Sequence, residues 1–432
     1  AEAFLSDRSS AFKALRAATA LGPEAVREAL PENLKLVVLQ HSDDGKRLLC
    51  SAISSARLDP TPPEPVEVEE GEEPPPLPPV PVCAVDVADL PHSLEALSEE
   101  SAKFSKAVRQ FLVSGGSAAT QEPAGLESRN PRFNKAEEVG AAWAMHTAHL
   151  SEYLSPVLGA AVPADFVGEA DQLVLLLDSA LATLPVDAVE PFATAGSSSR
   201  DFSLGLLAHR LQGVAEEGKG EKVLDKANVG YVADPQGEGY AERAEGALAG
   251  KTGVVGSHHV PSASEYKQLM ASSSAFFYFG AGSTQTVVDP GQLATTPVGA
   301  HAIMLFDGHE TDLSGRAQAE RDRKSSPLEK SLDRPVITAA LLSLQGAKSV
   351  LCNLGAASLD ANATMLTETI GSLEGGKDMG ASLQAARGAW LAHAKEAAAA
   401  AVAEPEAEAE AVDTGSFAAF NAVVFGVPHI AM

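Results

Sequence analysis

The sequence is poor in positive charge. Lysine and arginine number 32 among 432 residues, against 58 aspartate and glutamate residues, so the formal net charge is −26. Nucleic acids and anionic membranes are bound through basic faces that release counterions. We therefore expect neither of them as a partner.

Cysteine is scarce, and long apolar runs are missing. Cys50, Cys83 and Cys352 stand far apart and without metal-ligand spacing, which fits a reducing compartment such as the cytoplasm. No apolar run approaches the ~20 residues that cross a bilayer, and no signal-peptide pattern opens the chain. Because the first residue is Ala1 rather than methionine, we expect a processed product or the tail of a longer polypeptide.

Common motifs of nucleotide binding and serine hydrolysis are absent as well. The nearest approach to a phosphate-binding loop, residues 246–252, is one residue short and follows no apolar strand, and no Gly-x-Ser-x-Gly elbow occurs. Gly280-Ala281-Gly282 follows an apolar run but lacks the third glycine of a dinucleotide fingerprint. We expect no cofactor.

The composition nevertheless supports a large folded core. Hydrophobic residues make up 45% of the chain and charged residues 21%, as in globular proteins. Strand-like runs alternate with helical patterns, and this alternation predicts an α/β fold with a doubly wound, mostly parallel sheet. The elements expected in this part are strands over 173–177, 229–235 and 254–259 and helices over 202–212 and 262–272.

The first 160 residues predict a different layer. Residues 1–30 show helical spacing and predict a short helical lead-in. Two strands, 34–39 and 47–53, are joined by an Asp44-Gly45 turn, and a third strand is expected over 80–87. Amphipathic patterns predict helices over 93–113 and 135–158, which gives a β-hairpin and helix layer. Cys50 is expected to be a packed strand residue.

Four segments break these patterns. Residues 58–80 are rich in proline and glutamate and predict a disordered insertion, and residues 114–130 predict a linker. Residues 312–333 predict a charged loop. Residues 395–416, alanine-rich and then alternating with glutamate, predict a second low-complexity insertion.

Two groups of histidines are candidates for metal ligands. His146, His149 and Glu152 stand three residues apart on the 135–158 helix, but no second segment offers a matching ligand. His258 and His259 are adjacent on an expected strand and would therefore point to opposite faces. We expect no metal.

Two apolar runs form the centre of the sequence. Residues 275–279 break into Gly280-Ala281-Gly282-Ser283, and residues 302–306 are followed by Asp307-Gly308-His309-Glu310-Thr311. Such runs predict strands buried on both faces. Sites in open α/β sheets lie at the carboxyl ends of strands, so we expect the site here.

These residues resemble the CHAT domain, a caspase-like cysteine protease relative usually attached to TPR helices. Its first catalytic strand ends in His-Phe-Ala-Gly-His-Gly, which falls on residues 278–283, and its second ends in Ser-Ala-Cys-Glu-Thr, which falls on residues 307–311. Residues 173–185, 338–350, 381–386 and 420–426 resemble further strands and helices of the family. The resemblance implies a caspase-like fold, with residues 1–30 as the junction to preceding TPR-like helices.

On this placement the catalytic pair is lost. Gly282 stands at the position of the general-base histidine and His309 at that of the nucleophilic cysteine, so both are vestigial positions. Loss of one member of such a unit costs ~10⁶ in rate in subtilisin. We therefore predict a pseudoprotease, with an active caspase-like peptidase and a peptide-binding module in the old cleft as alternatives.

Cys352 lies on the strand after the one that bears His309, so in the expected sheet it is close enough to approach the vacated site. A buried, inert cysteine is nevertheless favoured.

Gly282 can be present for one of two reasons. If it provides only backbone freedom, a histidine should be readmitted there at modest cost; if its φ is positive, any side chain is strained.

The degenerate motifs, the insertions and the closing residues 420–428 resemble the carboxyl-terminal region of large scaffold proteins in the central apparatus of motile cilia. This resemblance implies a non-catalytic structural component of the axoneme, in a projection of a central microtubule that regulates motility. It implies other central-apparatus scaffold proteins as partners, and the central-pair microtubule through them. We expect three parts: residues 1–30, 31–160 and 161–432.

Overall fold

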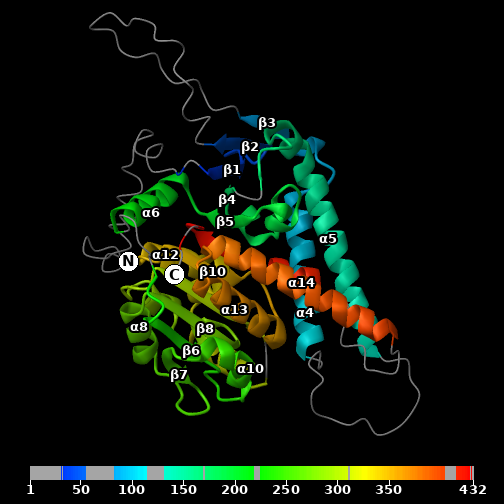
Figure 1. Ribbon diagram of the computed structural model, residues 1–432. Helices are drawn as coiled ribbons and strands as arrows, with labels where there is room; N and C mark the ends of the chain where they lie inside the picture. The colour runs from blue at the N-terminus through cyan, green and yellow to red at the C-terminus, as the bar shows by residue number, and fades with distance from the viewer. Residues whose placement is uncertain are drawn as a thin grey trace, which may run out of the picture.

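The computed structural model describes residues 31, 33–54, 82–113, 131–168, 171–217, 224–309, 312–403, 415–428 and 430. The predicted lead-in (1–30), the insertion (58–80) and the linker (114–130) lie outside the described residues. Within the described part, one sheet of eleven strands runs through the molecule in the order β3-β2-β1-β4-β5-β11-β10-β9-β8-β6-β7 (Figure 1). The strands are β1 (Leu34–His41), β2 (Arg47–Ser54), β3 (Cys83–Asp86), β4 (Gln172–Leu177), β5 (Ser197–Asp201), β6 (Val229–Ala233), β7 (Thr252–Val255), β8 (Ala275–Ala281), β9 (Ala302–His309), β10 (Ser349–Asn353) and β11 (Ala422–Gly426).

The sheet is mostly parallel. Strands β1 and β4, β4 and β5, β5 and β11, β10 and β9, β9 and β8, β8 and β6, and β6 and β7 pair in parallel. Pairs β1–β2, β2–β3 and β10–β11 are antiparallel. The predicted fold class, a mostly parallel α/β sheet with an amino-terminal hairpin, is confirmed. The strands predicted for residues 31–160 and for residues 161–432 share this one sheet.

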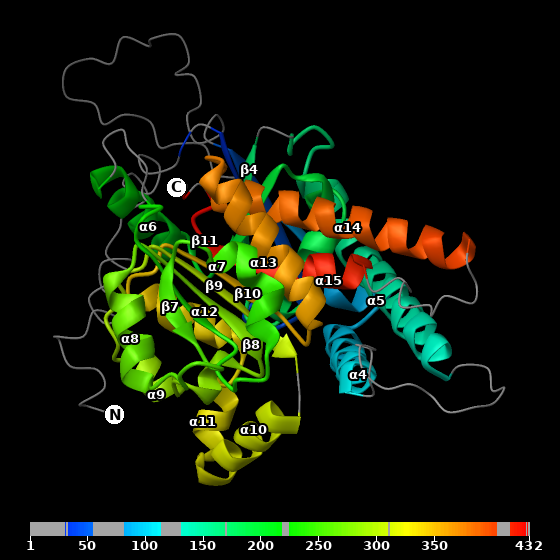
Figure 2. The same cartoon turned by 60° about the horizontal axis from the view of Figure 1, so that its bottom comes forward.

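Helices cover both faces of the sheet (Figures 1 and 2). On one face, Phe277 and Met304 of the sheet pack in one cluster with Leu366 and Leu383 of two helices that lie side by side, α13 and α14. The helices of the described part are α4 (Leu94–Val113), α5 (Pro131–Ala161), α6 (Leu204–Glu217), α7 (Glu245–Leu248), α8 (Ala263–Ser272), α9 (Pro290–Leu293), α10 (Asp312–Lys324), α11 (Pro327–Leu332), α12 (Pro335–Leu344), α13 (Leu359–Glu374), α14 (Met379–Ala403) and α15 (Gly415–Asn421).

The opposite face is covered in two halves. Beside β1, β2 and β4, Leu175 packs with Leu154 of α5. Beside β8, β9 and β10, Phe276 packs with Met270 of α8 and Leu342 of α12. Neighbouring residues of a central strand thus enter different cores, as the continuous apolar runs predicted. No helix of the described part has the length and apolarity of a membrane span.

Local signals explain several confirmed elements. The predicted hairpin turn places Gly45 at φ +67°, a conformation that glycine adopts without strain. Helix α8 begins at a capping box, in which Ser262 accepts from the Glu265 amide and Glu265 accepts from the Ser262 amide. Cys50 is buried in β2, as predicted.

Strand β5 was not predicted. Its sequence, Ser-Ser-Ser-Arg-Asp, carries no apolar pattern, yet all five residues are buried. Arg200 donates from Nε to Asp187 Oδ2 at 2.7 Å, and Arg210 donates from Nη1 to Asp201 Oδ2 at 2.9 Å. Because these buried charges are paired within the core, a polar strand is tolerated where an apolar one would be expected.

The predicted loop over 312–333 was wrong, and part of the predicted insertion over 395–416 is helical. Residues 312–333 are not a loop: they form α10 and α11, and a capping box of Ser326 and Glu329 with Pro327 at the first turn begins α11. Residues 395–403 continue α14, since alanine has the highest helix propensity, and residues 415–416 begin α15; residues 404–414 are not described.

The strand expected over 254–259 ends earlier. Strand β7 stops at Val255, so His258 and His259 lie in a turn rather than on a strand. The ring Nε2 of His259 lies 2.8 Å from Glu265 Oε1. The histidine pair is therefore part of the turn that leads into α8.

Candidate functional site

The carboxyl ends of β8, β9 and β10 meet at one edge of the sheet, where the sequence predicted the site. A cavity of about 390 Å³ opens there. Its walls come from these strand ends, from α10 to α12 and from α4. The lining residues are Arg109, Gly282, Ser283, Thr284, Leu305, Asp307, Gly308, Ser314, Gln318, Asp322, Lys330, Asp333, Arg334, Pro335, Thr338, Cys352, Asn353, Leu354, Gly355 and Ala356.

The two vestigial positions do not face each other in the sheet. The register pairs His309 with Ala281, after a bulge between Phe279 and Ala281, and Gly282 lies one residue beyond. Gly282 has φ +72°, and a Cβ there would lie 2.9 Å from the Cβ of Ser314. The expectation that a histidine is readmitted at Gly282 at modest cost is therefore wrong, because both the backbone and the neighbouring helix oppose a side chain.

Asp307 lies near the carboxyl end of β9. The Thr284 amide donates to its Oδ2 at 2.9 Å, and the side-chain amides of Asn353 and Asn362 donate to its backbone carbonyl at 2.7 and 3.1 Å. Loss of hydration raises the pKa of the Asp307 carboxyl to about 7, and the charge of Asp333 adds to the rise. Asp307 is thus held in place in a setting that favours its neutral form.

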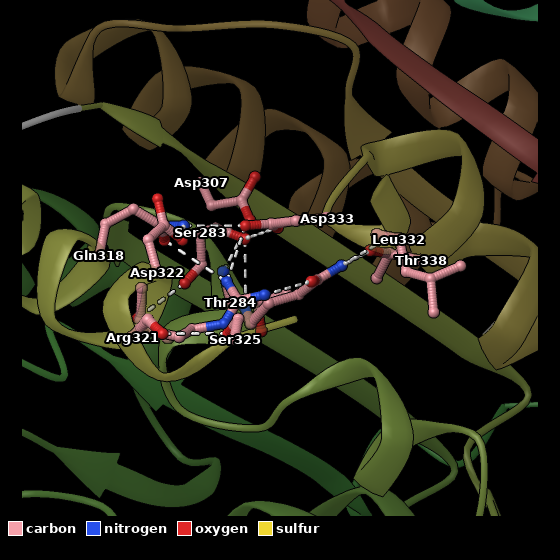
Figure 3. Close-up of polar contacts among 12 residues, drawn as sticks. Ser283, Thr284, Asp307, Gln318, Arg321, Asp322, Ser325, Leu332, Asp333 and Thr338 are labelled. Carbon is pink, nitrogen blue, oxygen red and sulfur yellow. Dashed lines mark hydrogen bonds and ion pairs between the residues drawn. The ribbon is translucent and has the colours of Figure 1, made fainter. Parts of the chain in front are cut away.

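Residues of α10 and α11 line one side of the cavity, and Figure 3 shows polar contacts of these helices. Arg321 of α10 donates to Asp333 at 2.7 Å and to the Gln285 side-chain oxygen at 3.2 Å. Gln318 donates to Asp333 at 2.9 Å, and the Gln285 amide also contacts Thr338 of α12. These contacts fix the two helices against the segment that follows β8.

Cys352 lines this cavity, so it does approach the vacated site. Its thiol is 1% exposed, and its Sγ lies 4.0 Å from the Pro335 carbonyl oxygen. Burial raises the pKa of the Cys352 thiol well above its ordinary range, and the charge of Asp307 adds to this. Burial therefore keeps this thiol in its protonated, weakly reactive form.

The histidines of α5 lie against Glu100 of α4. His149 Nδ1 is 3.0 Å from Glu100 Oε1, and His146 Nδ1 is 3.6 Å from Glu100 Oε2. Glu152 instead contacts His92, whose ring stacks on His149. The three residues considered as ligands on the sequence therefore do not converge on one point. In the described part of the chain, no group of three or more such side chains has a metal-binding arrangement.

Sequence reasoning missed the polar network around the cavity. Asp307 carried a signal, because it directly follows a buried apolar run at a strand end. No sequence signal marked Gln285, Arg321 and Asp333. These three residues come into contact only because α10 and α11 pack against the segment after β8.

Comparison with known proteins adds two findings. No protein-family model matches the chain. In sequence, 25% of residues are identical over 504 aligned positions to "Cilia- and flagella-associated protein 46" of Chlamydomonas reinhardtii. The chain is similar to a cilia-associated protein. The similarity takes in 87% of this chain and spans 18% of that protein's length.

The structural comparison concerns the fold alone. Two crystal structures of the Saccharomyces cerevisiae separase–securin complex match with TM-scores of 0.64 and 0.62 at 10% sequence identity. The matches cover 96% and 94% of this chain and 31% of the matched chains. The mixed α/β sheet therefore has the caspase-like arrangement of separase, and the predicted caspase-like fold is confirmed.

Proposed function

We propose that this chain is a non-catalytic scaffold domain of the ciliary axoneme. The observation that carries the proposal is the similarity over 87% of the chain to a cilia- and flagella-associated protein. Its place would be a projection on a central-apparatus microtubule, where it holds neighbouring scaffold proteins and helps to transmit the regulation of motility. It would contact the central-pair microtubule through those proteins.

We also propose that the domain is a degenerate CHAT-like pseudoprotease. Moving the family motif by one residue places its Gly-His-Gly on Gly280-Ala281-Gly282 and its histidine on Ala281, which faces His309 in the sheet. On either placement the base position carries no imidazole and the nucleophile position no thiol. A cysteine protease needs a thiolate and a base within hydrogen-bond reach.

The partition into parts at residues 30 and 160 belongs to the same proposal. Residues 31–160 would form the amino-terminal layer and residues 161–432 the pseudoprotease core, which share one sheet. The lead-in would join preceding TPR-like helices of a longer chain.

Cryo-electron tomography of axonemes tests the scaffold role. Cells whose ciliary protein lacks residues 31–432 should lose a defined density from one central-apparatus projection and should beat abnormally. Restoring the segment with Asp307→Asn should return both the density and the beat, because no catalysis is required. Normal projections in the truncated strain would contradict the scaffold role.

A peptide-binding role in the old cleft is the second candidate, and the 390 Å³ cavity favours it. A peptide array probed with the purified chain tests it: specific binding that Asp333→Asn weakens supports the role. An active peptidase, the third candidate, would cleave the same peptides and be labelled by thiol-directed caspase probes. We expect neither cleavage nor labelling, and probe labelling at Cys352 that tracks with turnover would overturn the pseudoprotease proposal.

A further inference from the structure

Two of the three cysteines lie directly opposite each other at one edge of the sheet. Cys50 of β2 and Cys83 of the edge strand β3 are register partners in an antiparallel pair. Side chains of directly opposite residues project from the same face, and both cysteines belong to the cluster that α5 covers. Thiols 33 positions apart in sequence are thus neighbours.

The backbone spacing suits a disulfide. The Val87 amide donates to the Lys46 carbonyl at 2.7 Å, and hydrogen-bonded pairs alternate along the ladder, so Cys50 and Cys83 form a hydrogen-bonded pair. Such pairs have Cα atoms ~5.5 Å apart. Disulfides accept Cα separations of ~4.4–6.8 Å, so β2 and β3 need not move apart. The bond draws the two Cβ atoms, ~4.5–5.5 Å apart in cross-strand pairs, to within ~3.5–4.5 Å of each other.

The two thiols differ in access. Cys50 is 1% exposed, and burial raises the pKa of its thiol to about 12, with Cys83 adding to the rise. Cys83 is half-buried and lines a cavity of about 360 Å³ at the end of α5. Small residues there, Gly159, Ala160 and Ala161, leave room beside its sulfur. A small disulfide reagent therefore reaches Cys83 first.

We propose that Cys50 and Cys83 form a reversible, redox-sensitive disulfide by exchange with glutathione disulfide. The Cys83 thiolate attacks one sulfur of glutathione disulfide, forms a mixed disulfide and releases one glutathione thiolate. Cys50 then gives up its proton to solvent and attacks the Cys83 sulfur, releasing the second glutathione. The net change oxidises two protein thiols to one disulfide and reduces one glutathione disulfide to two glutathione molecules.

The bond would tie the edge strand to its neighbour and close a covalent loop from residue 50 to residue 83. Closing a loop restricts the unfolded chain, so the oxidised protein should melt at a higher temperature. Because Cys83 remains half-exposed, a reducing glutathione pool can open the bond again.

Intact mass spectrometry of the full chain after thiol quenching tests the proposal. The protein is equilibrated in glutathione buffers of increasing oxidised fraction and then alkylated, and peptides are mapped without reduction. Wild type and Cys352→Ala should both lose two hydrogens, with one peptide link between Cys50 and Cys83. Cys50→Ala should instead stop at one glutathione adduct on Cys83, and Cys83→Ala should take up none.

The wild-type measurement tests by itself whether the Cys50–Cys83 disulfide forms, even if a cysteine variant fails to fold. A wild-type protein that keeps three alkylatable thiols in the oxidised buffers overturns the proposal. So does a stable glutathione adduct at Cys83 that never resolves, or a link that involves Cys352 or a second copy of the chain. A rise in melting temperature on oxidation that Cys83→Ala abolishes supports it.

Discussion

Replacing Gly282 by alanine should destabilise the fold through two effects, the strain of an L residue at positive φ and the crowding of its Cβ against Ser314. At φ +72° an L residue loses roughly 1–2 kcal/mol relative to its right-handed conformations. Alanine also restricts the unfolded chain, which offsets about 0.4–1 kcal/mol of this. In addition, the new Cβ would lie 2.9 Å from the Ser314 Cβ, and overpacking of this kind costs about 1–3 kcal/mol.

Gly250 provides a matched control. Its φ is +73°, and a Cβ there meets nothing within 4 Å. The two backbone effects are therefore nearly equal at Gly250 and Gly282 and cancel in the comparison. We expect Gly282→Ala to lower the free energy of unfolding by about 1–3 kcal/mol more than Gly250→Ala does.

Urea unfolding followed by circular dichroism measures this difference, and a double-mutant cycle with Ser314→Gly assigns it. Removing the Ser314 side chain should relieve most of the extra loss in Gly282→Ala, which gives a favourable coupling of about 1–3 kcal/mol. Equal losses at Gly282 and Gly250, or no coupling with Ser314, would refute the reasoning, because α10 would then not lie against the end of β8.

Three further outcomes are expected. Restoring the family's pair, with Gly282→His and His309→Cys, should lower the melting temperature and give no peptidase activity; peptide hydrolysis by this variant would show that the cleft is still built for catalysis. Arg321→Met should lower the free energy of unfolding by about 1.5–3 kcal/mol, since it removes a mostly buried charged hydrogen bond to Asp333 and another to Gln285. It should also speed limited proteolysis between α10 and α11; an unchanged cleavage rate argues against this anchor. The folded state keeps the Asp307 proton up to about pH 7, whereas the ordinary pKa is 3.8, so this group's contribution to stability falls as pH rises between those values. Asp307→Asn should therefore gain stability relative to wild type over that range, and a constant difference in urea titrations contradicts the pKa.

The sequence by itself determined the class of fold and the place of the site. Runs such as residues 275–279 and 302–306 are apolar at every position, as in doubly buried strands, and the glycines that follow them mark the carboxyl edge of the sheet. Local chemistry also set the hairpin turn at Gly45 and the start of α8, because a positive φ and a capping box depend only on residues a few positions apart.

Only the tertiary structure decided the strand β5, the two helices after β9 and the crowding at position 282, because these features depend on contacts between residues distant in sequence. The polar residues of β5 form a buried strand in which Arg200 pairs with Asp187 in the core. The charged segment after β9 becomes two helices, in which Arg321 of α10 is bonded to Asp333 at the end of α11 and to Gln285 after β8. The crowding that a side chain at position 282 would meet comes from a helix that begins thirty residues later, and no local pattern encodes such a contact. A sequence pattern reports what each segment prefers alone, whereas paired charges and close packing exist only once distant segments meet.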